Sequence, residues 1–356
     1  TRGRGVPHEG ARCAARGGVV CGAPSEASYG PGIVHRRHLR RGAALTTHTV
    51  ISADRLRIHV TVRGRENAPL TVLLSHCWTA EESDWHYQVH DLLERYGHDI
   101  RLITWDHRGH GRSERAPEDA CTIPHLTRDL GLVVDNFAPA GPLVVAGHSV
   151  GGMVITCIPE ERPDLLPRIV GLALVNTSCG ELYKVTLGLP EMGAILRDRL
   201  PFLLATRARV LSRSRRERFP VVERQIVRRF LFGRPQRPRD VGHVVDQLIH
   251  AWPETMSGFF KDMMRHDRVG NLSAFDDVPT VVLVGSRDLL TPPAHAATLA
   301  RGIRGARLVI APDAGHYLPL ERRALVSEEL YQLIDGALRR ATDQPAGRPD
   351  VHAARA

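Results

Sequence analysis

The sequence lacks a long uninterrupted run of apolar residues, and this absence argues against a membrane-spanning helix. None of its apolar runs reaches the roughly 18 residues that a span requires. The basic stretch HRRHLRR, residues 35–41, is not followed by the apolar segment of a secretory signal peptide. We therefore expect no transmembrane segment.

Lysine is almost absent: the chain contains only Lys184 and Lys261. Its net charge is nevertheless +9, so arginine supplies nearly all of the positive charge. A basic protein can bind nucleic acid or an anionic surface. The nearly exclusive use of arginine, however, indicates a compositional bias, and much of the excess lies near the N-terminus. We expect no nucleic-acid partner, and the oligomeric state stays open.

Paired cysteine motifs are also missing, since no C-x-x-C occurs and no cysteine has histidines at zinc-finger spacing. In a chain of this length the cysteines are expected to be free thiols, mostly buried, in a reducing compartment. They are Cys13, Cys21, Cys77, Cys121, Cys157 and Cys179. This pattern favours a cytoplasmic protein.

Motifs that hold nucleotides do not occur: there is no G-x-x-x-x-G-K-[ST] loop and no G-x-G-x-x-G after a predicted strand. Two histidine pairs are closely spaced, His86 with His90 and His107 with His110, but neither has the third ligand of a catalytic zinc site. We expect neither a cofactor nor a metal ion.

What the sequence does contain is a regular alternation of strand and helix patterns. Residues 1–48, rich in Gly, Arg, Ala and Pro without periodicity, predict a disordered basic tail. Beyond them, short apolar runs predict strands and amphipathic segments predict helices. The strands are expected over 55–64, 70–76, 100–106, 142–147, 168–176, 279–285 and 306–312, and the helices over 83–97, 122–137, 150–158, 292–300 and 325–338. This alternation predicts an α/β fold, a mostly parallel, doubly wound sheet with helices on both faces.

One interval breaks the alternation, because residues 179–272 carry helical periodicity without a strand pattern. It is too long for an ordinary connection. We interpret it as a helical cap inserted between two parts of the α/β core, 49–178 and 273–340. Residues 341–356 are expected to form a disordered C-terminal tail.

The strand predicted over 142–147 leads into GHSVG, in which Ser149 stands between Gly147 and Gly151. The spacing G-x-S-x-G is typical of a serine nucleophile on a sharp strand-to-helix turn, where the flanking positions must lack bulk. The alternative is a glycine-rich turn with an incidental serine. We interpret Ser149 as a nucleophile and the backbone N–H of Val150, at the start of the helix, as a donor to an oxyanion.

A serine nucleophile needs a histidine base and a carboxylate that orients it. Asp288 follows the strand predicted over 279–285, and His316 follows the one over 306–312. Because parallel strands end at one edge of a sheet, Ser149, Asp288 and His316 can meet there as a catalytic triad. The alternatives are a turn carboxylate that caps the next helix and an ordinary loop histidine.

On these residues the chain resembles the α/β-hydrolase superfamily over about 56–338. The segment DHRGHGRS, residues 106–113, is similar to its D-x-R-G-x-G-x-S loop, GHSVGG, residues 147–152, to its nucleophile elbow, and the order Ser, Asp, His to its triad. The resemblance implies a cap after the sixth strand and leaves the substrate open. A serine nucleophile argues against haloalkane dehalogenase and epoxide hydrolase chemistry, which the superfamily performs with an aspartate.

The chain departs from this resemblance after the third predicted strand, where it reads His76-Cys77-Trp78 instead of the usual His-Gly. The resemblance implies that the backbone N–H of Trp78 is the second oxyanion donor. Cys77 places a side chain where glycine is usual, either as a tolerated small residue or as a second reactive group.

Further residues are candidates for a substrate pocket. Some flank the expected nucleophile and oxyanion hole, and others recur at helical spacing in the insertion, a pattern of either core packing or an apolar pocket wall. These candidates are His76, Cys77, His148, Trp252, Met256 and Phe260.

The sequence thus predicts a serine hydrolase that cleaves a small, largely apolar carboxylic ester or lactone through an acyl-enzyme, with a small-molecule substrate as its partner. Two alternatives remain. The same triad could carry out C–C bond hydrolysis, acyl transfer or cofactor-free perhydrolysis, and the scaffold could serve a non-enzymatic ligand-binding protein.

Overall fold

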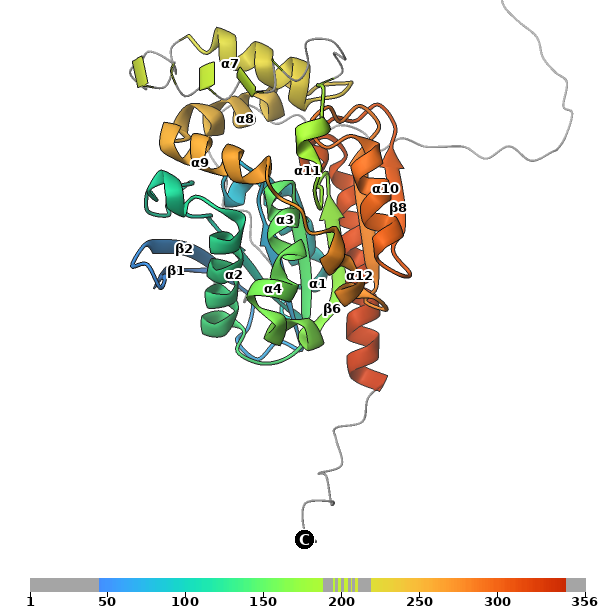
Figure 1. Ribbon diagram of the computed structural model, residues 1–356. Coiled ribbons are helices and arrows are strands. Elements are labelled where there is room, and N and C mark those ends of the chain that lie inside the picture. The colour runs from blue at the N-terminus through green and yellow to red at the C-terminus, as the bar shows by residue number, and fades with distance from the viewer. Residues whose placement is uncertain are drawn as a thin grey trace, which may run out of the picture. The chain divides into compact units, whose positions relative to one another are not determined.

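An eight-stranded sheet is the centre of the computed structural model (Figure 1). The structure describes residues 45–187 and 219–343, with a few isolated positions between 195 and 210. The strands are β1 (Leu45–Ile51), β2 (Arg57–Arg63), β3 (Leu70–Ser75), β4 (Ile100–Trp105), β5 (Leu143–His148), β6 (Ile169–Val175), β7 (Thr280–Gly285) and β8 (Arg307–Ala311). Their order across the sheet is β1-β2-β4-β3-β5-β6-β7-β8. Strands β3 to β8 pair in parallel, whereas β1 and β2 are antiparallel additions at one edge. The predicted mostly parallel α/β fold is confirmed.

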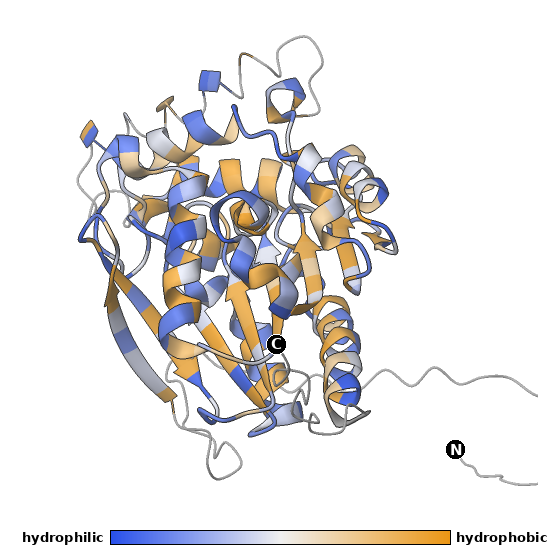
Figure 2. Ribbon diagram, turned by 60° about the horizontal axis from the view of Figure 1, so that its bottom comes forward, coloured by the Kyte–Doolittle hydropathy of each residue, from blue (hydrophilic) through white to orange (hydrophobic). Residues whose placement is uncertain are grey.

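Helices cover both faces of the sheet because the parallel strands are apolar on both faces. On β5, Val145 packs into a cluster with one set of helices, and its neighbour Val144 packs into a separate cluster with the other set. The first set is α2 (Ile123–Phe137), α3 (Val150–Thr156) and α10 (Pro293–Gly302), and the second is α1 (His86–Tyr96) and α12 (Arg323–Asp343). Figure 2 shows the hydrophobic strands between helices whose outer faces are hydrophilic.

The described part of the chain between β6 and β7 is helical. Its elements are η4 (Leu182–Lys184), α7 (Val221–Ile226), η5 (Val227–Leu231), α8 (Pro238–His250), α9 (Pro253–Met263) and η6 (Val269–Phe275). In Figure 1, α7, α8 and α9 lie together at one end of the sheet. Part of the predicted insertion, 179–272, falls outside the described residues, and its status as a separate cap domain stays a prediction.

Five short helices complete the described core: η1 (Glu82–Trp85), η2 (Glu118–Ala120), α4 (Ile158–Glu161), η3 (Pro163–Arg168) and α11 (Leu318–Glu321). The first of these follows β3 and the last follows β8, so both lie next to the loops that leave the sheet on the side of the site. None of the helices in the described part of the chain is long and apolar enough to cross a membrane.

Both tail boundaries predicted from the sequence need correction. Strand β1 begins at Leu45, inside the tail predicted over 1–48, and pairs with β2 from Leu45 opposite Arg63 to Ile51 opposite Arg57. Only Val50 of this edge strand is buried, so it carries no apolar alternation to signal it. Helix α12 continues to Asp343, past the predicted end of the core at 340. The remaining tail residues lie outside the described part.

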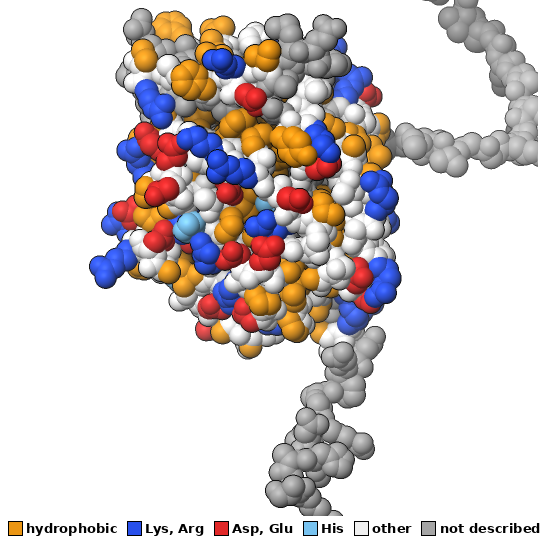
Figure 3. Space-filling model, viewed as in Figure 1, with side chains coloured by type: hydrophobic (Ala, Val, Ile, Leu, Met, Phe, Trp, Pro, Cys, Tyr) orange, Lys and Arg blue, Asp and Glu red, His pale blue; other side chains and the backbone are white. Residues whose placement is uncertain are grey.

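Charges of both signs are interspersed on the face of the molecule that Figure 3 shows. Many of the arginines have carboxylate partners, such as Arg162 with Asp135 and Asp164, and Arg304 with Asp277. Such exposed pairs contribute little to stability, typically about 0–1 kcal/mol each. They do, however, place a carboxylate beside these guanidinium groups, so the positive charge there is locally balanced.

Candidate active site

Ser149 lies on a strained turn between β5 and α3. Its backbone has φ 54° and ψ −115°, a conformation that non-glycine residues rarely adopt. A Cβ atom on Gly151 would lie 2.2 Å from the carbonyl oxygen of Ser75, and one on Gly147 would lie 2.4 Å from the Gly151 carbonyl. Both glycines are therefore required by close backbone contacts, which hold the serine in its strained conformation.

Asp288 and His316 come together in the loops after β7 and β8. His316 Nδ1 lies 2.9 Å from Asp288 Oδ2 and 3.1 Å from Oδ1. Asn176 Nδ2 donates to Asp288 Oδ2 at 2.7 Å, and the backbone N–H of Thr291 donates to Oδ1 at 3.0 Å. Asp288 and His316 are almost fully buried residues, at 2% and 3% exposure. The carboxylate is thus fixed in position and orients the imidazole through Nδ1.

The surroundings of Asp288 keep it ionised. Burial raises the pKa of this carboxyl, but His316 and the hydrogen bonds from Asn176 and Thr291 outweigh burial and lower the pKa below its usual value. Asp288 is therefore a carboxylate at neutral pH. Sequence reasoning missed Asn176 and Thr291, although Asn176 directly follows β6 at the same sheet edge.

The two expected oxyanion donors belong to residues near Ser149, because Val150 follows it in the chain and Trp78 lines the same cavity. Val150 is the first residue of α3, where backbone N–H groups have no partner inside the helix. Trp78 lies in the loop after β3, and its backbone N–H makes no hydrogen bond within the described part of the chain. The preceding N–H, that of Cys77, donates to Asp84 Oδ2 at 3.2 Å.

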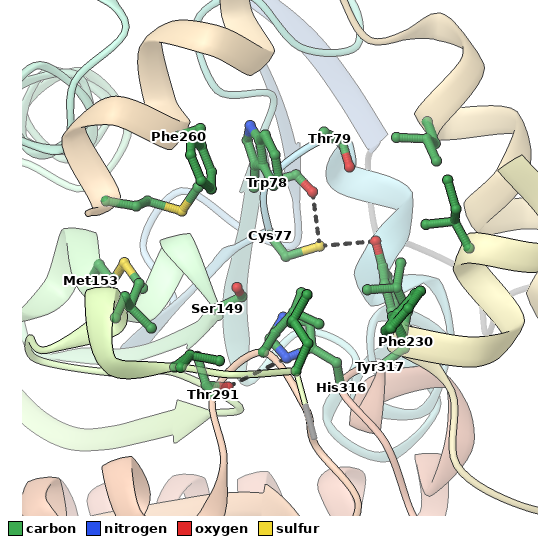
Figure 4. A pocket seen from close by; sticks show the side chains of 18 of the residues that line it. Cys77, Trp78, Thr79, Ser149, Met153, Phe230, Phe260, Thr291, His316 and Tyr317 are labelled. Carbon is green, nitrogen blue, oxygen red and sulfur yellow. Dashed lines mark hydrogen bonds between the residues drawn. The ribbon is translucent and has the colours of Figure 1, made fainter. Parts of the chain in front are cut away.

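A cavity of about 140 Å³ lies over Ser149 and His316 (Figure 4). Of the predicted site residues, Cys77, Trp78 and Phe260 also line it. The other lining residues are apolar or uncharged: Thr79, Met153, Leu182, Val185, Leu187, Ile226, Phe230, Leu231, Leu248, Met263, Met264, Leu290, Thr291 and Tyr317. No Asp, Glu, Lys or Arg occurs in this described lining, so the cavity suits an apolar, uncharged group.

Four predicted pocket residues do not line this cavity. His76 is buried and stacks on His107, with ring centroids 3.7 Å apart. Met256 is buried in an apolar cluster with residues of α8. The guanidinium of Arg115 lies over the Trp252 ring, with Arg115 Cζ 3.9 Å from the ring centroid. Helical spacing could not show which of Trp252, Met256 and Phe260 faces the cavity, because α9 has buried residues on more than one side. The fourth residue, His148, lies behind the site.

Three buried groups have the chemistry of metal ligands: donor atoms of Cys77, Asp84 and His148 lie within 4.8 Å of one another. Their atoms are already engaged. His148 Nδ1 lies 2.7 Å from Asp84 Oδ2, and His148 Nε2 lies 2.8 Å from the carbonyl oxygen of His316. Neither ring nitrogen has a lone pair directed at a shared ion, so hydrogen bonds and not metal coordination account for this cluster.

Buried histidines make the fold sensitive to acid. Burial lowers the pKa of His76 and His107, lowers that of His110 to about 3, and lowers that of His266 to about 4. Below about pH 6.5 these histidines take up protons in the unfolded chain but stay neutral in the folded chain, so stability decreases as pH falls. For His110 and His266 the loss is about 2 kcal/mol each at about pH 5. Groups whose pKa is raised in the folded state oppose this effect. They include Glu321, whose pKa burial raises to about 7, and His148, whose pKa is raised well above its usual value by the Asp84 carboxylate against the effect of burial.

We therefore expect a melting temperature several degrees lower at about pH 5 than at about pH 7.5, measured by differential scanning fluorimetry. His110→Gln keeps an acceptor for the backbone N–H of Thr79, which His110 Nε2 accepts at 3.1 Å. This variant should narrow the difference, because it removes one titrating group. An equal or higher melting temperature at the lower pH contradicts the explanation.

Comparisons with known proteins agree with this architecture. The sequence model of the alpha/beta hydrolase family matches residues 72–329. A putative carbamate hydrolase from Variovorax paradoxus is 27% identical over 286 residues, which cover 78% of this chain and 96% of that protein. The enol-lactonase of Burkholderia xenovorans is 25% identical with a TM-score of 0.62, covering 81% of this chain and 100% of that one. A thermophilic esterase from Thermogutta terrifontis is 22% identical with a TM-score of 0.64, covering 82% and 99%.

Proposed function

Because the chain belongs to the alpha/beta hydrolase family and is an enzyme of the hydrolase and esterase type, we propose that it cleaves small, largely apolar carboxylic esters or lactones with Ser149 as the nucleophile. The observation that carries the proposal is the position of Ser149. It lies on the strained turn, beside the His316–Asp288 pair, in the wall of an apolar cavity.

The proposed reaction follows from these contacts. His316 accepts the proton of Ser149 as the serine oxygen attacks the acyl carbon, while Asp288 holds the imidazole through Nδ1 and stabilises its charged form. The backbone N–H groups of Val150 and Trp78 donate to the oxyanion of the tetrahedral intermediate. The alcohol leaves with a proton from His316. Water, activated by the same histidine, then releases the acid.

The lining of the cavity limits the substrate. A carboxylate or ammonium group buried there would have no ionic partner among the described residues, and an unpaired buried charge costs several kcal/mol or more. The proposed acyl group is therefore short, uncharged and apolar. The esterase and the enol-lactonase among the similar structures act on bonds of the proposed kind, as their names state.

We expect p-nitrophenyl butyrate to be hydrolysed with a kcat/KM at least about 100-fold higher than p-nitrophenyl hemisuccinate, whose acyl chain is of similar length but ends in a carboxylate. The measurement is release of p-nitrophenol under matched conditions, with p-nitrophenyl acetate as a second uncharged substrate. Comparable values for butyrate and hemisuccinate would mean that the acyl group does not enter this cavity.

A fluorophosphonate probe tests the nucleophile separately. We expect it to modify Ser149, as located by peptide mass spectrometry, and to stop ester hydrolysis. Labelling of Ser149 without hydrolysis of any ester would favour C–C bond hydrolysis, acyl transfer or perhydrolysis with the same nucleophile. Labelling at another residue, with Ser149 unmodified and the activity lost, would contradict the proposal.

A further inference from the structure

A fully buried acid–base pair lies behind the candidate active site. Asp84 is in η1 and His148 is the last residue of β5, immediately before Ser149. Asp84 Oδ2 lies 2.7 Å from His148 Nδ1, and both side chains are 0% exposed. Neither residue lines the cavity, so neither can touch a substrate bound there.

This pair connects three segments of the site. Asp84 Oδ2 also accepts the backbone N–H of Cys77 at 3.2 Å, the residue before the proposed oxyanion donor Trp78. His148 Nε2 reaches the backbone carbonyl of His316 at 2.8 Å. Two side chains therefore join three segments: the loop after β3, the turn that carries Ser149 between β5 and α3, which we call the nucleophile turn, and the loop that carries His316. Figure 4 shows Cys77, Ser149 and His316 around the same cavity.

The partners of His148 determine its protonation state. A carboxylate and a carbonyl oxygen are both acceptors, and an imidazole donates from both nitrogens only when it carries two protons. Burial alone would lower the pKa of His148, but the Asp84 carboxylate outweighs burial and raises it well above the ordinary value. Burial raises the pKa of Asp84, and His148 in turn lowers it. The pair is an imidazolium with a carboxylate.

The other groups around the pair add no competing charge. Burial and the neighbouring Asp84 raise the pKa of the Cys77 thiol, so it stays protonated, and its Sγ lies 3.3 Å from the hydroxyl of Tyr317. Burial raises the pKa of that hydroxyl well above its usual value as well. The second carboxylate oxygen, Asp84 Oδ1, has no hydrogen-bond partner in the described part, so both contacts of the carboxylate converge on Oδ2.

We propose that Asp84 and His148 are positioning residues for catalysis. As an ion pair they fix the relative positions of three segments: the loop of Cys77 and Trp78, the turn of Ser149 between β5 and α3, and the loop of His316. This inference rests on the proposed function, because it concerns the geometry of that reaction. The proposal also accounts for a cysteine at position 77, where related proteins usually have glycine. The Cys77 backbone N–H is held by Asp84, and its thiol contacts the Tyr317 hydroxyl.

Asp84→Asn separates the charge of the pair from its shape. Without the carboxylate, a buried His148 is neutral and carries a single ring proton. If that proton stays on Nδ1, the bond to the His316 carbonyl is lost. If it moves to Nε2, the amide must turn its NH₂ group toward Nδ1, and the Cys77 N–H loses its acceptor. One of the three links breaks in either case.

We expect Asp84→Asn to lower kcat by about 10- to 100-fold and to leave KM within about threefold, because alignment is lost while the cavity lining is intact. The matched control is Asp129→Asn, which breaks another buried ion pair, that of Arg108 and Asp129, with both side chains 2% exposed and neither residue in the cavity lining. This control should lower the melting temperature without changing kcat.

The wild-type protein provides a readout that does not depend on a variant folding. In NMR spectra of the chain labelled with ¹⁵N-histidine, His148 should show two ring N–H protons from about pH 5 to about pH 9. One ring proton in this range, or an unchanged kcat in a folded Asp84→Asn protein, overturns the inference. Loss of activity in Ser149→Ala with full activity in Asp84→Asn would overturn the positioning role alone, whereas full activity in Ser149→Ala would remove the proposed function beneath it.

Discussion

Ser149→Ala is expected to lower kcat for ester hydrolysis by roughly 10⁴- to 10⁶-fold while the protein remains folded. The substitution removes only the hydroxyl oxygen, so the turn between β5 and α3 and its backbone hydrogen bonds are retained. The remaining residues can still bind the ester and polarise its carbonyl, which leaves a small residual rate. The measurement is p-nitrophenyl butyrate hydrolysis, with circular dichroism and melting temperature recorded on the same samples.

Ser327→Ala is the matched control, because Ser327 is also buried but lies in α12, where its hydroxyl donates to Asp91 at 2.6 Å. Losing this hydrogen bond should cost about 1 kcal/mol of stability and leave kcat unchanged. Wild-type turnover by Ser149→Ala would show that another group is the nucleophile. A similar loss of activity in both variants would point to unfolding and not to chemistry.

Gly151→Ala is expected to destabilise the protein by about 3 kcal/mol or more and to reduce activity by at least about 100-fold. The added Cβ would lie 2.2 Å from the carbonyl oxygen of Ser75 and 2.9 Å from that of His76. Both contacts are with backbone, which cannot move aside as a flexible side chain would. The strain must displace α3 or the loop after β3, and with it the spacing between Val150 and Trp78.

Gly242→Ala is the control for this substitution, because Gly242 also lies in a helix, α8, and an added Cβ there meets nothing within 4 Å. Alanine is the better helix former, so this variant should gain up to about 1 kcal/mol of stability and retain its activity. Urea denaturation gives the free energy of unfolding for both variants. If Gly151→Ala is as stable and active as Gly242→Ala, the close approach of α3 to Ser75 is not what fixes the nucleophile turn.

The position of the proposed nucleophile could be predicted because its requirements are local. Ser149 must adopt a strained backbone conformation, and the residues that permit this, Gly147 and Gly151, lie within two positions of it in the chain. The meeting of Asp288 and His316 was also predictable, although they are 28 residues apart, because parallel strands deliver their following loops to one sheet edge.

The pocket was less predictable. Trp252, Met256 and Phe260 have the same helical spacing, yet only Phe260 lines the cavity. Which of them faces the site depends on how α9 is rotated against the core, and residue spacing does not contain that rotation. Edge strand β1 was missed for a related reason, because its stability comes from pairing with β2 and not from a buried apolar face of its own.

The sequence by itself determined the α/β fold, the nucleophile turn and the loops from which Asp288 and His316 come, because periodicity, backbone strain and strand direction are properties of short segments. Only the tertiary structure decided what encloses the serine and what holds the loops together. Asp84 and His148, 64 residues apart, carry no shared motif, and their 2.7 Å contact exists only because η1 packs against β3, the neighbour of β5 in the sheet. The packing of distant segments likewise gave the cavity a lining that is uncharged among the described residues, and with it the class of substrate that we propose.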